Sequence, residues 1–386
     1  MGDGFQVGRG SVRFRSGLAL LAAFGLSTAA CGGGAEAPEV GSPRPGTETT
    51  ETSPERPDGG GPEVGEPEGD GSDGDGATEF DVGDVATGLD TVWALAFAPD
   101  GALHFTERGG RIGRMTREGD GSYGRAQFEE VEGVVEQGEG GLMGLAIDEG
   151  GRRFVMFTSD TDNRIAELRA DGSLRILVRG IKSGSIHNGG RLAIGPDGNL
   201  YAATGDAGDR SSPRRDGFNG RILRIRPDTS SVEVVSTGHR NPQGLCFDSE
   251  GRLLSTEHGP DRGDEVNLIE KGSDYGWPET EGTGIANWTP TIAPAGCAVY
   301  AGDAFPGLRG RMLFTTLKDR SLRQLNLAAD RQSAREEDAL ISGDLGRLRD
   351  VAVGPDGEVF VATSNRDGRG DPGKGDDRIV RLTPRA

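Results

Sequence analysis

Apolar and polar positions alternate along the chain from residue 80 onward, in six segments that resemble one another. Each begins with an apolar strand, usually followed by a Pro-Asp-Gly type of turn and a second strand. The segments are LAFAPDGALHFTE at 95, LAIDEGGRRFVMFTS at 145, LAIGPDGNLYAATGD at 192, LCFDSEGRLLSTEHG at 245, AVYAGDAFPGLRGRMLFTT at 298 and VAVGPDGEVFVATSN at 351. Asp-Gly and Gly-Gly between alternating apolar residues are typical of β-hairpins. The pattern therefore predicts a repeat of about fifty residues built from short strands.

Several repeats carry a third strand, as in GRIGRM, NRIAELR, GRILRIRP and DRIVRLTP. A period near fifty with three or four strands per unit is typical of a β-propeller, and six repeats predict six blades. One blade cannot cover both of its faces, whereas a closed ring of blades covers all of them. The strand-like segment EFDVGDVA at 79–86 is expected to join the final blade and close the ring. No amphipathic helix of 10–15 residues separates the strands, which favours an all-β fold over an α/β fold.

The composition agrees with a chain that turns often and is strongly acidic. The 386 residues include 67 Gly, and 43 Lys and Arg stand against 62 Asp and Glu, for a formal net charge of −19. A phosphate-backbone partner requires a basic surface, so nucleic-acid binding is not expected. The chain has no run of 18 apolar residues, and we therefore predict no membrane-spanning helix.

The first 31 residues have the pattern of an export signal. Basic residues precede the apolar run GLALLAAFGL at 17–26, which is too short to span a membrane. The run leads through STAA into Cys31 and resembles a bacterial lipobox, with Thr28 where Leu is usual. We expect a lipidated Cys31 that anchors an exported protein to the cell membrane, facing the periplasm or the cell exterior. A plain secretory signal with a free Cys31 is the alternative.

An acidic stretch follows the export signal. Residues 32–79 contain 13 Asp and Glu against two Arg, and Val40 and Val64 are their only large apolar side chains. Such a stretch buries too little apolar surface to offset chain entropy, so it predicts a disordered linker rather than a small acidic domain. The predicted organisation is a lipoprotein signal peptide at 1–31, a disordered acidic Gly/Pro-rich linker at 32–78 and the propeller at 79–386.

Two further cysteines lie in the propeller region. Cys246 and Cys297 fall near the starts of neighbouring repeats. In the oxidising compartment that an export signal implies, a disulfide between them would persist. Their spacing alone leaves the disulfide open.

Two loops carry residues suited to catalysis. In SIHNGGRLAIGPDGNLYAATGD, His187 precedes one strand and Asp206 ends its partner, so a hairpin brings the two together. A His held by a carboxylate is the usual arrangement of a general base, and a structural His that caps a loop is the alternative. In GHRNPQGL, Arg240, Asn241 and Gln243 place a cation and amide donors directly ahead of a strand.

Two other loops suggest ion binding. EHGPDRGDEVNLIEKGSDYGWP combines carboxylates with glycines, and such oxygen ligands suit Ca²⁺ better than Zn²⁺. A solvated acidic loop is the alternative. Arg347 and Arg349 alternate on the approach to a strand and therefore point the same way, and Lys318 adds a cation from the preceding repeat. In an acidic protein this cluster predicts a site for a small polyanion, with ordinary surface arginines as the alternative.

Together these motifs resemble the glucose/sorbosone dehydrogenase family, soluble quinoproteins that oxidise sugars with pyrroloquinoline quinone (PQQ), and within it the bacterial aldose sugar dehydrogenases. The resemblance covers roughly residues 80–384. The motifs that carry it are VWALAFAPDGALHFTERGGRI, GEGGLMGLAID, HNGGRLAIGPDG, GHRNPQGL, EHGPDRGDEVNLI with DYGWP, WTPTIAPAG and RLRDVAVGPDG. It implies a six-bladed propeller with PQQ and Ca²⁺ as cofactors and aldose sugars as substrates.

The resemblance also implies roles for individual residues. The catalytic group comprises a base, a carboxylate that orients it and a cation on the quinone, which match His187, Asp206 and Arg240. Contacts with PQQ are implied for Arg240, Asn241, Thr291, Lys318, Arg347 and Arg349, with Trp288 as a flanking aromatic. Backbone carbonyls that hold the Ca²⁺ on PQQ match Gly259 and Pro260, and a second calcium site matches Glu265 and Tyr275.

Glu139, in GEGGL, stands where some members carry a Gln that contacts PQQ. A carboxylate at this place repels an anionic cofactor unless it is protonated or turned toward an arginine. We keep Glu139 among the expected cofactor contacts on that condition.

The reaction implied is oxidation of an aldose at C1 to a lactone. His187 removes the hydroxyl proton, the C1 hydride passes to C5 of PQQ, and Ca²⁺ and Arg240 stabilise the charge that develops on the quinone. Electrons then pass to an acceptor that the motifs do not identify. Short loops predict an open site and broad use of aldoses. A non-catalytic calcium-binding propeller that recognises a glycan or protein partner is the alternative, and a lactonase-type hydrolase with a metal held by side chains is a third reading.

Overall fold

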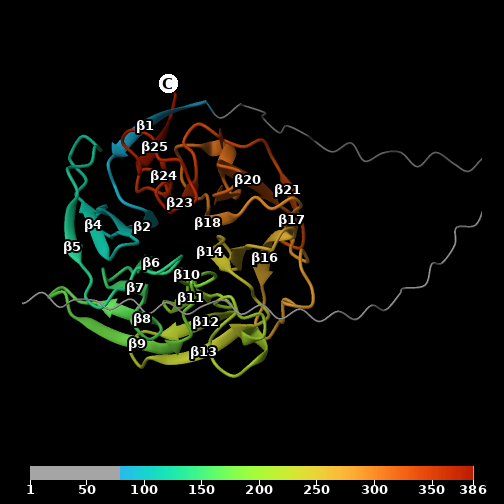
Figure 1. Ribbon diagram of the computed structural model, residues 1–386. Helices are drawn as coiled ribbons and strands as arrows, with labels where there is room; N and C mark the ends of the chain where they lie inside the picture. The colour runs from blue at the N-terminus through green and yellow to red at the C-terminus, as the bar shows by residue number, and fades with distance from the viewer. Residues whose placement is uncertain (1–78, 386) are drawn as a thin grey trace, which may run out of the picture. The chain divides into compact units, whose positions relative to one another are not determined.

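The computed structural model describes residues 79–385, and these residues form six antiparallel sheets around a ring (Figure 1). Each sheet is a meander in which strands consecutive in the chain pair with one another, except at the closing blade and at one short strand of blade 5. The six-bladed β-propeller is therefore confirmed. Within residues 79–385 the helices are two single 3₁₀ turns, η1 (Ser212–Arg214) and η2 (Pro306–Leu308). The expected signal peptide at 1–31 and linker at 32–78 lie outside the described residues.

The first three blades follow one another in sequence. Blade 1 contains β2 (Val92–Phe97), β3 (Leu103–Glu107), β4 (Arg111–Met115) and β5 (Gln127–Glu130). Blade 2 contains β6 (Leu142–Ile147), β7 (Arg153–Thr158), β8 (Asn163–Leu168) and β9 (Leu174–Ile181). Blade 3 contains β10 (Gly189–Ile194), β11 (Leu200–Thr204), β12 (Arg221–Arg226) and β13 (Ser231–Ser236).

The other three blades complete the ring. Blade 4 contains β14 (Pro242–Phe247), β15 (Leu253–Glu257), β16 (Asp264–Ile269) and β17 (Ala286–Trp288). Blade 5 contains β18 (Pro294–Val299), β19 (Met312–Thr316), β20 (Ser321–Leu327), β21 (Ala334–Glu336) and the short β22 (Ile341–Ser342), which also pairs with β20. Blade 6 contains β23 (Leu348–Val353), β24 (Val359–Thr363), β25 (Ile379–Pro384) and β1 (Phe80–Ala86).

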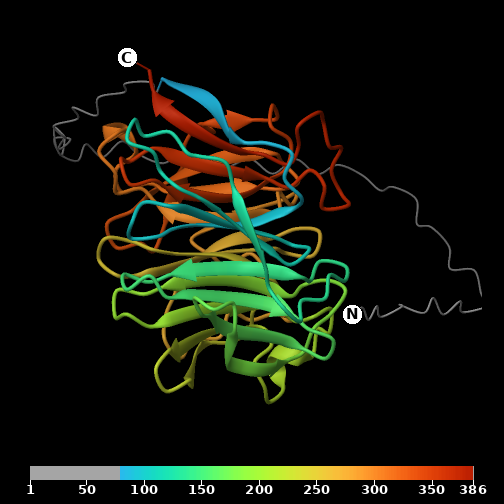
Figure 2. The ribbon, with the colours of Figure 1, turned by 90° about the vertical axis from the view of Figure 1, so that its left-hand side faces the viewer.

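The two ends of the propeller meet in blade 6. Strand β1 pairs with β25 in antiparallel register from Phe80 opposite Pro384 to Ala86 opposite Ile379, and Figure 2 shows the blue and red strands side by side. The closing strand predicted at 79–86 is thereby confirmed. Because the first strand completes the last sheet, blades 6 and 1 pack against each other like every other neighbouring pair.

Close backbone approach at the ring axis explains the glycine in the inner strands. A Cβ on Gly144 would lie 2.2 Å from the carbonyl oxygen of Gly190, and one on Gly244 would lie 2.4 Å from that of Ala295. Each glycine therefore lets the inner strand of one blade reach the backbone of the next. The register of the inner strands shifts at the same places, as between Pro242 and Gly244.

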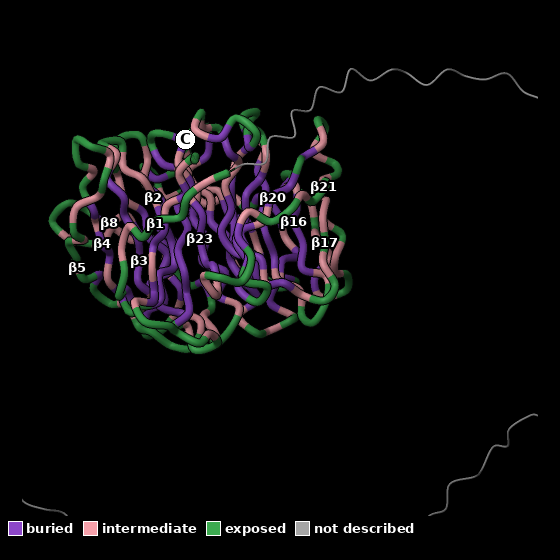
Figure 3. Tube along the Cα trace, turned by 90° about the horizontal axis from the view of Figure 1, so that it is seen from above, coloured by how far each residue is buried: buried purple, intermediate pink, exposed green. Residues whose placement is uncertain are grey.

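Apolar side chains between neighbouring blades form the core. Phenylalanines on the second strands are fully buried, among them Phe105, Phe154, Phe314 and Phe360. Figure 3 shows the buried residues along the strands and the exposed ones in the connecting loops. Burial of one such ring contributes about 1.5–3 kcal/mol. A disulfide between Cys246 on β14 and Cys297 on β18, with Cα atoms 5.8 Å apart, adds a covalent link between blades 4 and 5. The bond that the sequence left open is thus formed.

Loops alternate between the two ends of the ring because every blade is an antiparallel meander. The tight hairpins of the Pro-Asp-Gly type lie at one end, where the inner strand turns into the second strand. The loops that enter each inner strand, and those that leave each second strand, lie at the other end. The candidate site residues fall on these loops. No helix among residues 79–385 is long and apolar enough to cross a membrane.

Candidate functional site

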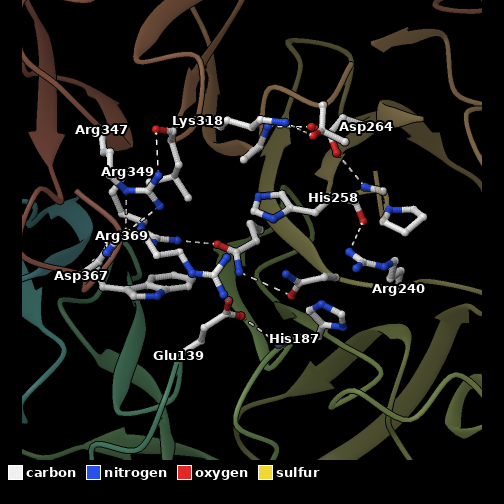
Figure 4. A pocket seen from close by; sticks show the side chains of 18 of the residues that line it. Glu139, His187, Arg240, His258, Asp264, Lys318, Arg347, Arg349, Asp367 and Arg369 are labelled. Atoms are coloured by element: carbon white, nitrogen blue, oxygen red, sulfur yellow. Dashed lines mark hydrogen bonds and ion pairs between the residues drawn. The ribbon is translucent and has the colours of Figure 1, made fainter. Parts of the chain in front are cut away.

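A pocket of about 310 Å³ opens where the inner strands begin (Figure 4). It receives side chains from all six blades or the loops between them. Its lining comprises Trp93, Arg108, Glu139, His187, Arg240, Asn241, Gln243, His258, Gly259, Pro260, Asp264, Thr291, Ala293, Leu317, Lys318, Arg347, Arg349, Asp367 and Arg369. The loops singled out in the sequence therefore converge on one cavity.

His187 is held at the pocket by its backbone and its ring. Its φ of 57° turns the chain into β10, and its backbone N–H donates to Glu139 Oε2 at 2.9 Å. Ring nitrogen Nδ1 lies 2.9 Å from Asp206 Oδ1. An ionised Asp206 requires the proton on Nδ1, which leaves the lone pair on Nε2, and the structure gives Nε2 no partner within residues 79–385. The pair has the geometry of a general base and its orienting carboxylate.

Asp206 is buried behind His187 and does not line the pocket. Besides the imidazole, Oδ1 accepts the backbone N–H of Gly208 at 2.8 Å. The other oxygen, Oδ2, accepts the indole N–H of Trp277 at 2.9 Å. These three donors fix both oxygens of a carboxylate that has almost no contact with solvent.

Arg240 precedes β14 and projects into the pocket from blade 4. Its Nη1 donates to the carbonyl of His258 at 3.0 Å, and its Nε is buried without a partner among residues 79–385. Burial lowers the pKa of the Arg240 guanidinium. The Glu257 carboxylate fixes the backbone around Arg240. It accepts the N–H groups of Arg240 and Asn241 and forms a hydrogen bond with His239 at 2.8 Å. Arg240 is therefore a rigidly placed cation with an unused donor.

Arg347 and Arg349 form the opposite wall, which Figure 4 shows across the pocket from His187 and Arg240. Arg347 makes two bonds to Asp367 Oδ2, at 2.9 and 2.8 Å. Arg349 donates to Gln243 Oε1 at 2.6 Å, and its Nε is buried without a partner in the described chain. Burial lowers the pKa of Arg349 to about 10, so it remains charged at neutral pH. Burial opposes the ionisation of Asp367, but Arg349 and Arg347 hold the pKa of this carboxyl below its usual value.

Lys318, Thr291 and Glu139 complete the rim. Lys318 Nζ donates to Thr291 Oγ1 at 2.6 Å. Glu139 Oε1 accepts a bond from Arg369 Nη2 at 2.6 Å while Oε2 holds the backbone of His187. The carboxylate of Glu139 is thus turned toward an arginine, which meets the condition set for an anionic ligand beside it.

The donor set suits a small polyanion. Six basic side chains line the pocket against three carboxylates, although the whole chain is acidic. Buried donors without a partner among residues 79–385 include Nε of Arg240 and Nε of Arg349. An unpaired buried donor costs about 1–3 kcal/mol, so a ligand that bonds these atoms recovers that cost.

The loop at 258–264 reaches the same pocket. Gly259 and Pro260 both line it. Asp264 accepts the backbone N–H of Gly259 at 2.7 Å and those of Ile292 and Ala293 at 2.6 Å each, so it ties two loops together. Burial raises the pKa of the Asp264 carboxyl. A carboxylate engaged with three backbone donors positions the loop, which leaves the carbonyls to a hard cation.

Glu265 and Tyr275 lie apart from the main pocket, at a small cavity that also touches Gly259 and Trp277. Glu265 Oε2 accepts the backbone N–H of Thr283 at 2.8 Å, and burial raises its pKa. The Tyr275 hydroxyl donates to the carbonyl of Leu268 and accepts from the N–H of Glu270, and its ring stacks on His239. Tyr275 can therefore offer only its backbone carbonyl to a cation.

Trp288 does not line the pocket and is withdrawn from the expected cofactor contacts. It lies on the outer strand β17, packs against Phe314 with ring centroids 5.3 Å apart and donates to Glu336 at 2.9 Å. The aromatic residue at the pocket is Trp93, the second residue of the inner strand β2. Its ring lies 4.5 Å from the guanidinium carbon of Arg191.

Sequence reasoning missed several pocket residues, and some of them had a usable signal. Arg108 comes two residues after Thr106, as Asp206 comes two residues after Thr204, so these two residues take equivalent places in repeats one and three. Comparing equivalent positions of the repeats would therefore have identified Arg108, whereas Asp367 comes four residues after Thr363 and has no such counterpart. Arg369 and Trp277 carry no such signal, because they reach the site from irregular loops.

Comparison with known proteins gives one family. Residues 89–379 match the family model named Glucose / Sorbosone dehydrogenase. The PQQ-bound form of the aldose sugar dehydrogenase from Streptomyces coelicolor superposes with a TM-score of 0.70 at 36% identity, over 80% of this chain and 99% of that chain. The aldose sugar dehydrogenase YliI of Escherichia coli is 29% identical over 72% of this chain and 89% of its own length. An uncharacterized Synechocystis protein, slr1608, is 32% identical over 74% of this chain and 84% of its own length.

Proposed function

The chain belongs to the glucose/sorbosone dehydrogenase family, and we propose that it oxidises aldose sugars at C1 to lactones with PQQ and Ca²⁺ as cofactors. Its named relatives include aldose sugar and quinoprotein glucose dehydrogenases, and it is an oxidoreductase of that kind. The observation that carries the proposal is the pocket in which the His187–Asp206 pair lies opposite a wall of arginines.

The pocket residues fit a flat, polycarboxylate cofactor. Arg347, Arg349 and Lys318 supply charge-assisted donors for carboxylates, and Arg240 supplies a donor near the base. When bound, PQQ supplies the hydride acceptor and Ca²⁺ the Lewis acid that polarises its quinone oxygens. The backbone carbonyls of Gly259 and Pro260 would hold that cation.

The chain's own residues supply proton transfer and charge stabilisation. His187 Nε2 accepts the proton of the sugar C1 hydroxyl, because Nδ1 is held by Asp206. The buried Asp206 carboxylate stabilises the imidazolium that forms, and Glu139 holds the backbone that aims the ring. Arg240 is placed to stabilise negative charge that develops beside the base. Each of these groups is fixed before the substrate arrives, so little reorganisation opposes the reaction.

A second cation site is proposed at the small cavity beside Glu265 and the carbonyl of Tyr275. The buried carboxylate of Glu265 already accepts backbone donors, so a cation there would add to the order of the loop between β16 and β17. For its location, we propose an exported lipoprotein anchored through Cys31, on the pattern of the first 31 residues.

Reconstitution of the apo-protein tests the proposal. PQQ and Ca²⁺ are added to the full chain, binding is measured by calorimetry, and reduction of an artificial electron-accepting dye is followed with a panel of aldoses. We expect saturable PQQ binding and turnover of several aldoses. A protein that binds PQQ without turnover of any aldose would point to a binding propeller, and a protein that binds no PQQ would refute the proposal.

A further inference from the structure

We propose that Trp277 is a positioning residue that couples the His187–Asp206 pair to Arg240 through one indole ring. This inference rests on the proposed function, because it concerns the same proton transfer. Trp277 does not line the main pocket, although it borders the small cavity beside Glu265 and Tyr275, and its effect on the reaction is exerted through Asp206 and Arg240.

The indole crosses from one blade to the next. Trp277 belongs to the loop between β16 and β17 of blade 4, whereas Asp206 follows β11 of blade 3. The backbone N–H of Trp277 donates to the carbonyl of Gly238 at 3.0 Å, and its side chain is 95% buried. The backbone bond and the burial therefore hold the indole ring in place beside Asp206.

The bond from Trp277 Nε1 completes the donors on Asp206. Oδ1 is shared by His187 Nδ1 and the Gly208 N–H, whereas the structure records Trp277 as the donor to Oδ2 within residues 79–385. Without this hydrogen bond, Oδ2 of the buried Asp206 carboxylate would have no donor, and its negative charge would be less stabilised. That charge would favour the imidazolium form of His187, so the base would stay protonated to a higher pH.

The face of the same ring supports Arg240. The guanidinium carbon of Arg240 lies 5.4 Å from the ring centroid, and that of Arg210 lies 4.7 Å from it. Arg240 has an unpartnered Nε and one bond to a carbonyl, so the ring is a principal constraint on its plane. One side chain thus sets the placement of both groups that act on the reacting sugar.

The charged and titratable groups around His187 come from five loops. Asp206 contacts its ring and Glu139 its backbone, while Arg369 neutralises the far oxygen of Glu139. Arg240 and His258 lie on the blade 4 side of the pocket. Of these groups, Trp277 contacts Asp206 and Arg240, so its removal alters the charge around His187 from two sides.

Magnetic resonance on the unaltered protein gives the first test. The full chain has three tryptophans, so ¹⁵N labelling of tryptophan yields three indole N–H signals. As pH is lowered, the Trp277 signal is expected to move with the same midpoint as the ¹⁵N signals of the His187 ring. The signals of Trp93 and Trp288, whose indoles do not bond Asp206, serve as internal references. A Trp277 signal that does not follow the His187 titration would overturn the inference.

Trp277→Phe gives the second test, because it keeps an aromatic ring and removes the N–H. We expect kcat to fall roughly ten- to a hundredfold at neutral pH, the range for one lost hydrogen bond to a charged group. The acidic limb of the kcat profile should move up by about one pH unit, which corresponds to a tenfold change in the protonation equilibrium. Affinity for PQQ, measured by calorimetry, should change by less than about threefold, since its cationic contacts remain.

Tyr201→Phe is the matched control. It also removes a hydrogen bond from an aromatic side chain to a carboxylate, namely that from the Tyr201 hydroxyl to Asp197 at 3.2 Å. This bond lies at the opposite end of the propeller. This variant should keep wild-type kcat and the wild-type pH profile. A merely structural Trp277 would lower the melting temperature without moving the acidic limb, and that result would refute the coupling.

Failure of this inference is distinguishable from failure of the proposed function. If the wild-type chain neither binds PQQ nor oxidises aldoses, the proposed function fails, yet the resonance titration still decides whether Trp277 and His187 are coupled. If Trp277→Phe does not fold, that titration on the wild-type chain remains the deciding measurement. If the wild type is active and the folded variant matches it in kcat and pH profile, only the inference is wrong.

Discussion

Asp206→Asn is the substitution for which the structure makes the sharpest prediction. The carboxylate receives donors on both oxygens, from His187 Nδ1 and Gly208 N–H on Oδ1 and from Trp277 Nε1–H on Oδ2. An amide has one oxygen and one NH₂ group, so it cannot accept at both ends. With its oxygen toward His187, its NH₂ group faces the indole N–H. With its oxygen toward Trp277, its NH₂ group faces Gly208 and donates to Nδ1.

Either orientation removes catalytic power. The second forces the proton of the neutral imidazole onto Nε2, which then has no lone pair for the sugar hydroxyl. The first keeps the tautomer but places two donors face to face and loses the negative charge that stabilises the imidazolium. A positioned general base contributes about 10²–10⁴ in rate, and we expect Asp206→Asn to lose kcat within that range. Affinity for PQQ should be retained, because the cations of the opposite wall are unchanged.

The assay is dye reduction at saturating aldose by protein reconstituted with PQQ and Ca²⁺, with PQQ affinity measured separately by calorimetry. Asp197→Asn is the matched control, since Asp197 lies in the turn of the same hairpin and accepts from Asn199 and Tyr201 at the far end of the ring. It should keep wild-type turnover. An Asp206→Asn protein that retains kcat within about threefold of wild type, with PQQ bound, would refute the assigned role of the pair.

Four further predictions concern the base, the arginine wall, the metal and the anchor. His187→Ala should bind PQQ normally by calorimetry and lose at least about a hundredfold in aldose turnover, and wild-type turnover would contradict the mechanism. The pKa of Arg349 is lowered to about 10, so the guanidinium is charged below that pH and PQQ affinity should fall as pH rises through it. An affinity that stays constant between pH 9 and about 11 would contradict the lowered pKa of Arg349. Chelation should abolish turnover before the circular dichroism of the propeller changes, because the proposed cation is held by the carbonyls of one loop, and full activity without residual metal would argue against its role. Cys31→Ser should move the protein from the membrane to the soluble fraction, and continued pelleting after a salt wash would refute lipid anchoring.

The repeated part of the molecule could be predicted because its pattern is local. The six inner strands, the hairpin turns and the closing strand at 79–86 each leave a signature within about ten residues. Residues at fixed places in the repeat inherit their position from it, so His187 and Asp206 had to meet at the end of one hairpin. Arg347 and Arg349 could be placed for the same reason, because they lie where the chain enters the inner strand β23.

The parts that escaped prediction depend on contacts between blades. Trp288 lies in the long connection after β16, where no repeat fixes the register, and its short strand β17 turned it to the outer edge. Trp277 comes from the same connection and reaches Asp206 across a blade boundary. Predicting the disulfide required the distance between two inner strands, and the spacing of Cys246 and Cys297 along the chain does not give that distance. Local periodicity determines a strand and its neighbour but not the loop that crosses to the next blade.

An acidic protein can hold a polyanion because charges act on the pocket according to distance and burial, not according to the net charge. Much of the −19 arises from residues 32–79 and does not describe the charge at the pocket, which six basic side chains line against three carboxylates. Within the pocket, Arg349 is buried beside Asp367, so its charge is screened far less than an exposed charge is. Asp367 compensates part of the cost of burying Arg347 and Arg349 in the absence of a ligand. The Nε of Arg349, which has no partner among residues 79–385, then remains for an anion, and the surrounding acidity opposes anions that cannot reach this buried wall.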